Sequence, residues 1–440
     1  MEIKNNASKL IKPSTPTPST LRNYNISFFD EQQACINVPI ILYYSTLQSD
    51  NSVIIFDHFE ISLSKALTIF YPLAGRYVRE NSFIDCSDQG ALYVQAKATF
   101  QLAEFLGLPW ELKVSMLNKF LACEIHEAGE IHHPLLSAKV TSFKCGGFAL
   151  SMSFSHKFAD MSTICTFIDT LSTISQEMDN TLKLAKHAPN FNVAHHYLKR
   201  GLNPSPVTIR SSMEAKISVR TFLFKGEAIA KMRKKLNVKP NGSHRPSKVQ
   251  VVESLLWKAF VSIDKANNGQ FNVSTLTQSV DLRNKVVPKL PNNSCGNFFT
   301  LANARIDPRE GQNIDLQEFY DVLHESIKNI NNNYTKAVTP GGKEYEVLLK
   351  PFLEYYEMYN DNDINAYSFT SWCKFSWQNA DFGWGKPVWK SVGKMETQNF
   401  VIMMDDQEGD GVEAWVHLDE KRMCQLEQDP DIRTYAFLAQ

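Results

Sequence analysis

The stretch from residue 134 to residue 174 constrains the fold most, because it predicts two strands and a helix in immediate succession. The segments PLLSAKVTSFK and FALSMSFS flank Cys145-Gly146-Gly147, a spacing typical of a hairpin whose glycines supply the turn angles. In the second segment apolar residues alternate with Ala and Ser, so that strand has one apolar and one small polar face. The following MSTICTFIDTLSTI repeats apolar residues at helical spacing. His156 and Asp160 therefore lie where the chain turns from strand to helix.

Strand and helix signals alternate along the whole chain, which favours an α/β fold over an all-helical or all-β one. At roughly 150 residues per domain, the 440 residues suggest two or three domains. The Pro- and Asn-rich stretch 181–215 predicts a crossover linker between an N-terminal domain, 1–180, and a C-terminal domain, 216–440. Further predictions are helices at 62–70 and 247–263, strands at 217–224 and 275–283, and a surface loop at 329–346.

Composition narrows the function. The chain has 46 basic and 47 acidic side chains, so no net field would gather nucleic acid or an anionic membrane, and a small, weakly charged partner fits better. The first thirty residues lack the apolar core of a signal peptide, and no run approaches ~18 apolar residues, so we expect a cytoplasmic protein. The eight cysteines include no C-x-x-C pair, which favours reduced thiols over disulfides or a zinc site.

The spacing of His156 and Asp160 leaves two interpretations open. A histidine held at the end of a strand can serve as a general base, because its unperturbed pKa near ~6.5 lets it accept a proton at neutral pH. Asp160 would then either orient the imidazole, as in a serine protease, or serve only the structure. The alternative is an ordinary polar residue at the end of a strand, since H-x-x-x-D alone is a short pattern.

A second motif, Asp381-Phe382-Gly383-Trp384-Gly385, lies about 220 residues further on. Two glycines flanking a tryptophan predict a tight loop against an aromatic side chain, which is first of all a structural device. The chain has neither a phosphate-binding P-loop nor the G-x-S-x-G of a serine hydrolase. Its adjacent histidine pairs lack the spacing of metal ligands, and we expect no metal.

HxxxD in mid-chain followed by DFGWG near the C-terminus resembles the plant BAHD acyl-CoA-dependent acyltransferases. The segments YPLAGR (71–76), VDLR (280–283) and Gly296-Asn297 also match landmarks of that family in order, so the resemblance covers essentially the whole chain. The stretches at 14–18, 145–147, 155–157 and 368–373 look most like its vinorine synthase-like branch of alkaloid O-acetyltransferases and acylsugar acyltransferases. Met161 after Asp160 and Ser294-Cys295 before Gly296 depart from many members and leave the acceptor open.

The resemblance implies an α/β fold of two similar chloramphenicol-acetyltransferase-like domains, each a mixed β-sheet with helices, with the active-site channel at their interface. His156 would be the general base in acyl transfer from acyl-CoA, with acetyl-CoA favoured, to a hydroxyl of a plant specialised metabolite such as an alkaloid alcohol or a sugar ester. The protein would act as a monomer without a permanently bound cofactor. A catalytically silent ligand-binding or partner-binding relative, or an enzyme acylating an amine, are the alternatives.

The resemblance also assigns roles to single residues. Thr370 and Trp372 would donate hydrogen bonds to the oxyanion, unless Trp372 is simply a buried aromatic residue. Asp160 would pair with Arg283 as a structural brace. The loop of Asp381, Gly383 and Gly385 would be an architectural element beside the CoA channel, and Ser247 would contact CoA or only cap its helix.

Overall fold

The structure, a computed structural model, describes residues 1–45, 52–129, 132–176, 188–197, 216–237, 245–307, 315–334 and 345–438. The chain divides into two compact units: unit 1 is Met1–Pro206 with Leu290–Phe298 and Phe375–Met395, and unit 2 is Val207–Lys289 with Phe299–Lys374 and Glu396–Gln440. Each unit is built on a mixed sheet with helices, which confirms the α/β prediction. Most of the predicted linker lies outside the described residues, so the domain boundaries stay a prediction.

Unit 1 contains a six-stranded sheet in the order β1-β6-β7-β8-β3-β13, in which β6 and β7 are parallel and the other pairs antiparallel. Its strands are β1 (Ile3–Ile11), β3 (Asn37–Tyr44), β6 (Ala91–Ala98), β7 (Leu136–Ser142), β8 (Phe148–Ser155) and β13 (Trp389–Val392). The predicted hairpin is confirmed as β7 and β8, and Gly146 takes a φ of 82° in its turn. A small sheet combines β2 (Asn23–Asn25), β5 (Phe83–Asp85) and β4 (Arg76–Val78).

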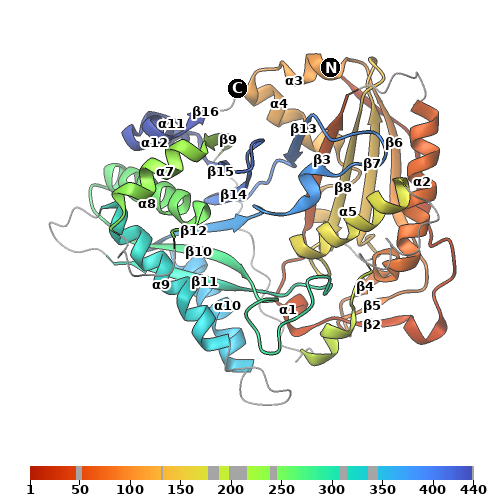
Figure 1. The fold of residues 1–440 in the computed structure, drawn as a ribbon, viewed down its shortest axis with the longest axis horizontal. Coiled ribbons are helices and arrows are strands. Elements are labelled where there is room, and N and C mark those ends of the chain that lie inside the picture. Colours follow the sequence, from red (N-terminus) through yellow and green to blue (C-terminus); the bar gives the residue numbers. More distant parts are fainter. Residues whose placement is uncertain are drawn as a thin grey trace. The chain divides into compact units, whose positions relative to one another are not determined.

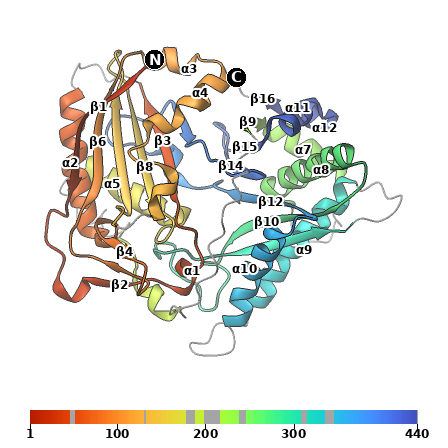
Figure 2. The same cartoon turned by 180° about the vertical axis from the view of Figure 1, so that it is seen from behind.

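Helices cover both faces of the six-stranded sheet (Figure 1, Figure 2). On one face lie α2 (Ser52–Ile69) and α5 (Met161–Gln176), and the ring of Phe154 in β8 packs 5.5 Å from that of Phe167. On the other face Tyr43 packs 5.4 Å from Phe105. This second face carries α3 (Leu102–Leu106), α4 (Trp110–Leu117) and η3 (Asn118–Phe120). Among its described residues, unit 1 also has η1 (Ser19–Leu21), α1 (Phe28–Glu31), η2 (Tyr71–Ala74), η4 (Ile125–Gly129), η5 (Asn192–His196) and η6 (Ser376–Asn379).

Unit 2 contains a seven-stranded sheet in the order β11-β10-β12-β14-β15-β9-β16. Its strands are β9 (Ile217–Phe224), β10 (Val273–Asp281), β11 (Phe299–Ile306), β12 (Ile364–Ser371), β14 (Phe400–Asp405), β15 (Val412–Asp419) and β16 (Phe437–Leu438). The core helix is α8 (Lys248–Asn268), whose Phe260 stacks 4.9 Å from Tyr367 of β12. The other helices are α7 (Gly226–Lys235), α9 (Leu316–Tyr334), α10 (Tyr345–Asn360), α11 (Glu420–Gln428) and α12 (Pro430–Tyr435).

Local sequence patterns predicted most of these elements. The helices expected at 62–70 and 247–263 are parts of α2 and α8, and the strand at 217–224 is β9. The loop predicted at 329–346 is wrong at both ends, because α9 continues to Tyr334 and α10 begins at Tyr345, and the part between them, 335–344, lies outside the described residues. Buried Ile330 continues the apolar stripe of α9, so packing overrides the weak helix propensity of the neighbouring asparagines. Within the described part of the chain, no helix is long and apolar enough to cross a membrane.

Candidate functional site

His156 follows directly after β8, where its main-chain N–H donates to the carbonyl of Ile36 at 2.8 Å. The side chain is half-buried, and its Nδ1 lies 3.0 Å from Oδ1 of Asn297. Burial lowers the pKa of His156 below its ordinary value of 6.5, while the charge of Asp160 raises it part of the way back. The imidazole is therefore mostly neutral at pH 7, as a general base must be.

Asn297 fixes the tautomer of that imidazole. Its Nδ2 donates to the carbonyl of His156 at 2.7 Å and to Oδ1 of Asp30 at 2.8 Å. Since Nδ2 carries the donors of the amide, Oδ1 must be the acceptor toward Nδ1 of His156. The hydrogen-bond network therefore assigns the proton to Nδ1 and leaves the lone pair on Nε2, the atom that can take a proton from a substrate.

Asp30 anchors Asn297 from a distant part of the sequence. Its Oδ1 also accepts the main-chain N–H of Asn297 at 2.8 Å, and its Oδ2 accepts from the amide of Ser27 at 2.8 Å. Asp30 is completely buried, and burial raises its pKa while the hydrogen bonds from Ser27 and Asn297 lower it. The sequence indicated Asn297 only as a family landmark and gave no signal for Asp30, because this contact joins residues 267 positions apart.

Asp160 does not occupy the position of an orienting partner at Nδ1. Its Oδ1 accepts from the N–H of Thr163 at 2.9 Å, as a helix-capping residue does, and its Oδ2 accepts from the N–H of Phe298 at 3.1 Å. These contacts join the start of α5 to the segment that carries Asn297, and they favour a structural role over a dyad. Arg283, the partner expected for Asp160, belongs to unit 2, and that pair stays a prediction.

The DFGWG loop is fixed to α5 and the sheet of unit 1. Oδ1 of Asp381 accepts the amides of Gly383 at 2.8 Å and Gly385 at 2.9 Å. Both glycines have a positive φ, 94° and 83°, a backbone conformation that residues with a side chain rarely adopt. Ser175 of α5 donates to the carbonyl of Phe382 at 2.6 Å. The ring of Trp384 packs 5.1 Å from Phe148 of β8. The contacts support an architectural loop.

The remaining predicted residues lie in unit 2. Thr370 is in β12, and it alternates with Tyr367 and Phe369, which face the α8 core, so Thr370 points to the opposite face of the sheet. Trp372 follows β12, is 7% exposed, and donates its main-chain N–H to Met403 at 2.7 Å. His156 belongs to unit 1, so a site that combines it with Thr370 and Trp372 is part of the proposal below.

Arg283 and Ser247 have clear local contacts. Arg283 is buried, and its Nη1 lies 2.9 Å from Oδ1 of Asp281. Ser247 precedes α8 and its Oγ accepts the amide of Gln250 at 3.0 Å, which makes it the N-cap of that helix. A contact of Ser247 with CoA stays a prediction.

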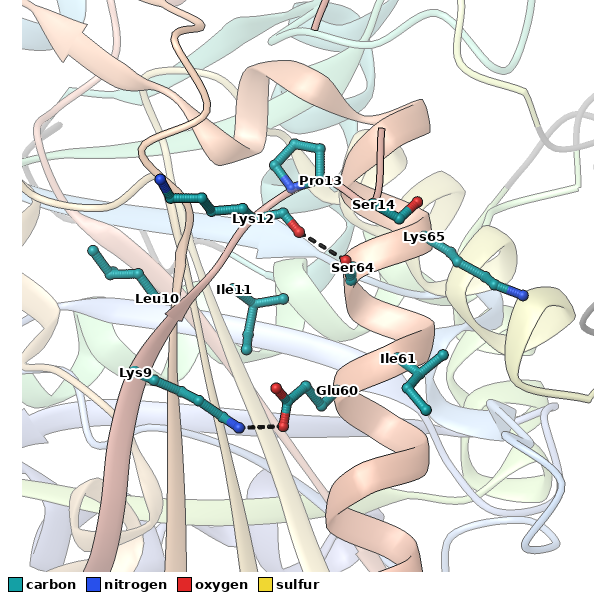
Figure 3. Close-up of a pocket in the computed structure, with 10 residues that line it drawn as sticks. All are labelled: Lys9, Leu10, Ile11, Lys12, Pro13, Ser14, Glu60, Ile61, Ser64 and Lys65. Atoms are coloured by element: carbon teal, nitrogen blue, oxygen red, sulfur yellow. Dashed lines mark hydrogen bonds and ion pairs between the residues drawn. The ribbon is translucent and has the colours of Figure 1, made fainter. Parts of the chain in front are cut away.

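A pocket of about 460 Å³ lies on unit 1 between β1 and α2 (Figure 3). Lys9 in it pairs with Glu60, and Ser64 donates to the carbonyl of Lys12 at 2.8 Å. The side chains of Lys12 and Lys65 point away from one another (Figure 3), so the pocket does not gather positive charge around one point. None of the predicted site residues lines it, and we assign it no part in the reaction.

Three carboxylates of unit 2, Asp406, Glu408 and Asp410, bring ligand atoms within 4.8 Å of one another. Asp406 uses its Oδ1 to accept the amides of Gly409 and Gly411 at 2.8 and 2.9 Å, which closes a tight turn between β14 and β15. We assign no ion to this turn.

Comparisons with known proteins agree with the motifs. The model of a transferase family matches residues 1–432. Limonoid 1-O-acetyltransferase of Citrus sinensis is 33% identical over 99% of this chain and 98% of its own length. Vinorine synthase of Rauvolfia serpentina is 31% identical over 96% of this chain and 95% of its own length. The crystal structure of vinorine synthase superimposes with a TM-score of 0.81 at 30% identity, covering 99% of this chain and 98% of that one.

The chain belongs to this family of transferases, the BAHD acyltransferases. It is an acyl-CoA-dependent O-acyltransferase, which takes acyl-CoA and a small-molecule acceptor as its substrates. More distantly, TRI101 of F. sporotrichioides in complex with coenzyme A and T-2 shares the fold, with a TM-score of 0.69 at 16% identity over 94% of this chain and 99% of that one.

Proposed function

We propose that this enzyme transfers an acetyl group from acetyl-CoA to a hydroxyl of a plant specialised metabolite, with His156 as the general base. The names of the relatives support acetyl as the group and an alcohol as the acceptor, because they include limonoid and stemmadenine O-acetyltransferases. An alkaloid alcohol and a sugar ester remain the acceptors we favour. We also keep the monomeric state and the cytosolic location as predictions.

One observation carries this proposal: the Asn297 amide leaves Nε2 of His156 as the basic nitrogen. In the reaction, the acceptor hydroxyl gives its proton to Nε2 while its oxygen bonds to the thioester carbonyl carbon. Thr370 and Trp372 would donate hydrogen bonds to the resulting oxyanion. The C–S bond then breaks, and the CoA thiolate leaves with the electron pair and takes the proton from the imidazolium. The imidazole is neutral again, and no acyl-enzyme is required.

The test combines a substrate search with a variant. The enzyme is incubated with acetyl-CoA, malonyl-CoA and other acyl-CoAs and a plant extract, and mass spectrometry identifies the metabolite that gains the acyl group. We expect acetyl transfer and an ester product, which mild alkali hydrolyses, whereas an amide from an amine acceptor survives. A preference for another acyl group would contradict the proposal, and so would release of no CoA thiol with any extract.

His156→Ala is then assayed with the acceptor so identified. Because a positioned base contributes about 10² to 10⁴ in rate, we expect the variant to fold and to be nearly inactive. His126→Ala is the control, since His126 is an exposed histidine of the same unit. Retention of most activity by His156→Ala would refute the role of His156.

A further inference from the structure

Lys157, the residue after His156, is a buried lysine to which the reaction described above assigns no part. It is 8% exposed, and its Nζ donates to the main-chain carbonyl of Glu31 at 3.1 Å. The ammonium also lies over the ring of Tyr77, 5.8 Å from its centre. Transfer of an ammonium group from water into the protein interior costs roughly several kcal/mol unless interactions with its new neighbours offset that cost. An apolar side chain at position 157 would avoid this desolvation cost, so the buried charge calls for an explanation.

The carbonyl that Lys157 contacts belongs to the last residue of α1, a helix of only four residues. Such a short helix has no stability of its own and depends on contacts at its ends. At its start, Ser27 and Asp30 form a capping box. At its end, the ammonium of Lys157 meets the negative pole of the helix, where a positive charge is favourable. Lys157 therefore fixes the end of α1 next to Asp30.

Asp30 in turn holds the amide that orients the base. Its Oδ1 receives both the main-chain N–H and Nδ2 of Asn297, at 2.8 Å each. Oδ1 of Asn297 then lies 3.0 Å from Nδ1 of His156. A continuous set of contacts thus leads from the ammonium of Lys157 through α1 and Asn297 to the imidazole.

We propose that Lys157 is a positioning residue for acyl transfer: its ammonium holds the end of α1 so that Asp30 and Asn297 keep the proton of His156 on Nδ1 and Nε2 as its basic nitrogen. The inference rests on the proposed function, in which His156 is the base.

The charge of Lys157 acts on His156 as well. Burial is the main cause that lowers the pKa of His156, the charge of Asp160 raises it, and the charge of Lys157 lowers it further. Burial lowers the pKa of Lys157 itself, and the titratable groups around it are Cys35, Asp30, Glu31 and Arg79. Removal of the ammonium should therefore make His156 easier to protonate and raise its pKa.

The test reads the imidazole directly and needs no acceptor. Full-length protein with labelled histidine is titrated by NMR, and the signal of His156 is identified among the 11 histidines by its absence from His156→Gln. In the wild type we expect the Nδ1–H tautomer and a titration midpoint below that of a free histidine. In Lys157→Met, which keeps the aliphatic stem, we expect a higher midpoint and loss of the single tautomer. Lys157→Arg should restore both.

Lys139→Met is the matched control. Lys139 is also a buried lysine of unit 1, and its Nζ donates to the main-chain carbonyl of Lys119 at 2.8 Å. Its removal should lower stability but leave the titration of His156 unchanged. If Lys157→Met does not fold, Lys157→Gln, which keeps a donor without the charge, should still raise the midpoint.

A His156 signal that is the same in Lys157→Met, or in Lys157→Gln, as in the wild type would overturn the inference, and so would a wild-type protein in the Nε2–H tautomer. The two proposals fail separately. If His156→Ala is active, the proposed function is refuted whatever the NMR shows. If His156→Ala is inactive and the His156 signal is unchanged in Lys157→Met, only this inference is refuted.

Discussion

Glu253 gives the prediction with the clearest magnitude. It lies in α8 and is 0% exposed, and neither of its carboxylate oxygens has a hydrogen-bond partner among the residues that the structure describes. Burial raises the pKa of Glu253 to about 8. The side chain is therefore mostly protonated in the folded protein at pH 7, because ionising it there would leave an unpaired charge inside unit 2.

The sign of the pH dependence of stability follows from the protonation of Glu253 in the folded and in the unfolded chain. Below pH 4.5, the ordinary pKa of a glutamate, the carboxyl is protonated in both the folded and the unfolded chain. Between pH 4.5 and 8 the folded protein keeps a proton that the unfolded chain has lost, so the free energy of unfolding falls by about 1.36 kcal/mol per pH unit from this group. Above pH 8 the loss is complete, at about 5 kcal/mol.

Glu253→Gln removes this dependence, because glutamine does not titrate. The free energy of unfolding is measured by urea denaturation, followed by tryptophan fluorescence, at pH 5, 6, 7 and 8. We expect the difference in the free energy of unfolding, variant minus wild type, to rise by roughly 3.5 kcal/mol from pH 5 to pH 8, whatever its value at pH 5. Glu346→Gln, an exposed position in the first turn of α10, should stay parallel to the wild type. A difference between Glu253→Gln and wild type that does not change with pH would refute the reasoning.

Three further variants separate chemistry from structure. Asn297→Ala removes the acceptor at Nδ1 of His156 and should lower kcat by roughly 10²-fold with little change in the KM for acetyl-CoA, measured by CoA-thiol release; an unchanged kcat would contradict the tautomer assignment. Asp381→Ala removes the acceptor of two glycine amides and should cost roughly 1–3 kcal/mol in urea denaturation while the folded enzyme keeps its kcat; a large loss of kcat in folded protein would point to chemistry instead. Ser247→Ala should cost about 1 kcal/mol as a lost helix cap, and a raised KM for acetyl-CoA would instead support the CoA contact.

The parts of the fold that the sequence predicted are those set by local patterns. Alternation in β8 and helical spacing in α5 and α8 are visible in a few neighbouring residues, and these elements lie where the patterns place them. Pairing across the chain left no such trace. Strand β13 pairs with β3, which lies more than 300 positions earlier, as the register of Trp389 with Tyr43 shows. The sequence therefore predicted the class of each unit, but not that residues 375–395 complete the sheet of unit 1.

The candidate site likewise combines residues that a local sequence pattern indicates with residues that distant segments supply. His156 could be found because it ends a strand with an alternating pattern, and the DFGWG loop because its glycines are unusual in sequence. The hydrogen bonds that decide the state of His156 could not, because Asp30 and Asn297 come from segments far from it and from each other, and Asn297 was indicated only as a family landmark. A buried hydrogen bond between such segments depends on the folded sheet, and neither spacing nor propensity indicates it.

The neutral partner of His156 has a chemical consequence. A carboxylate at Nδ1 would stabilise the imidazolium and raise the pKa of the histidine, whereas the amide oxygen of Asn297 fixes the ring without adding a charge. Asp160 acts on the imidazole through its charge, while its oxygens accept from Thr163 and Phe298. In the proposed reaction the imidazolium exists only until CoA thiolate takes its proton. A lowered pKa keeps the imidazole neutral before the first step and favours release of that proton in the second. On this argument, Asn297→Asp should raise the pKa of His156 and move the acidic limb of the pH–rate profile to higher pH, although the geometry at Nδ1 is nearly kept.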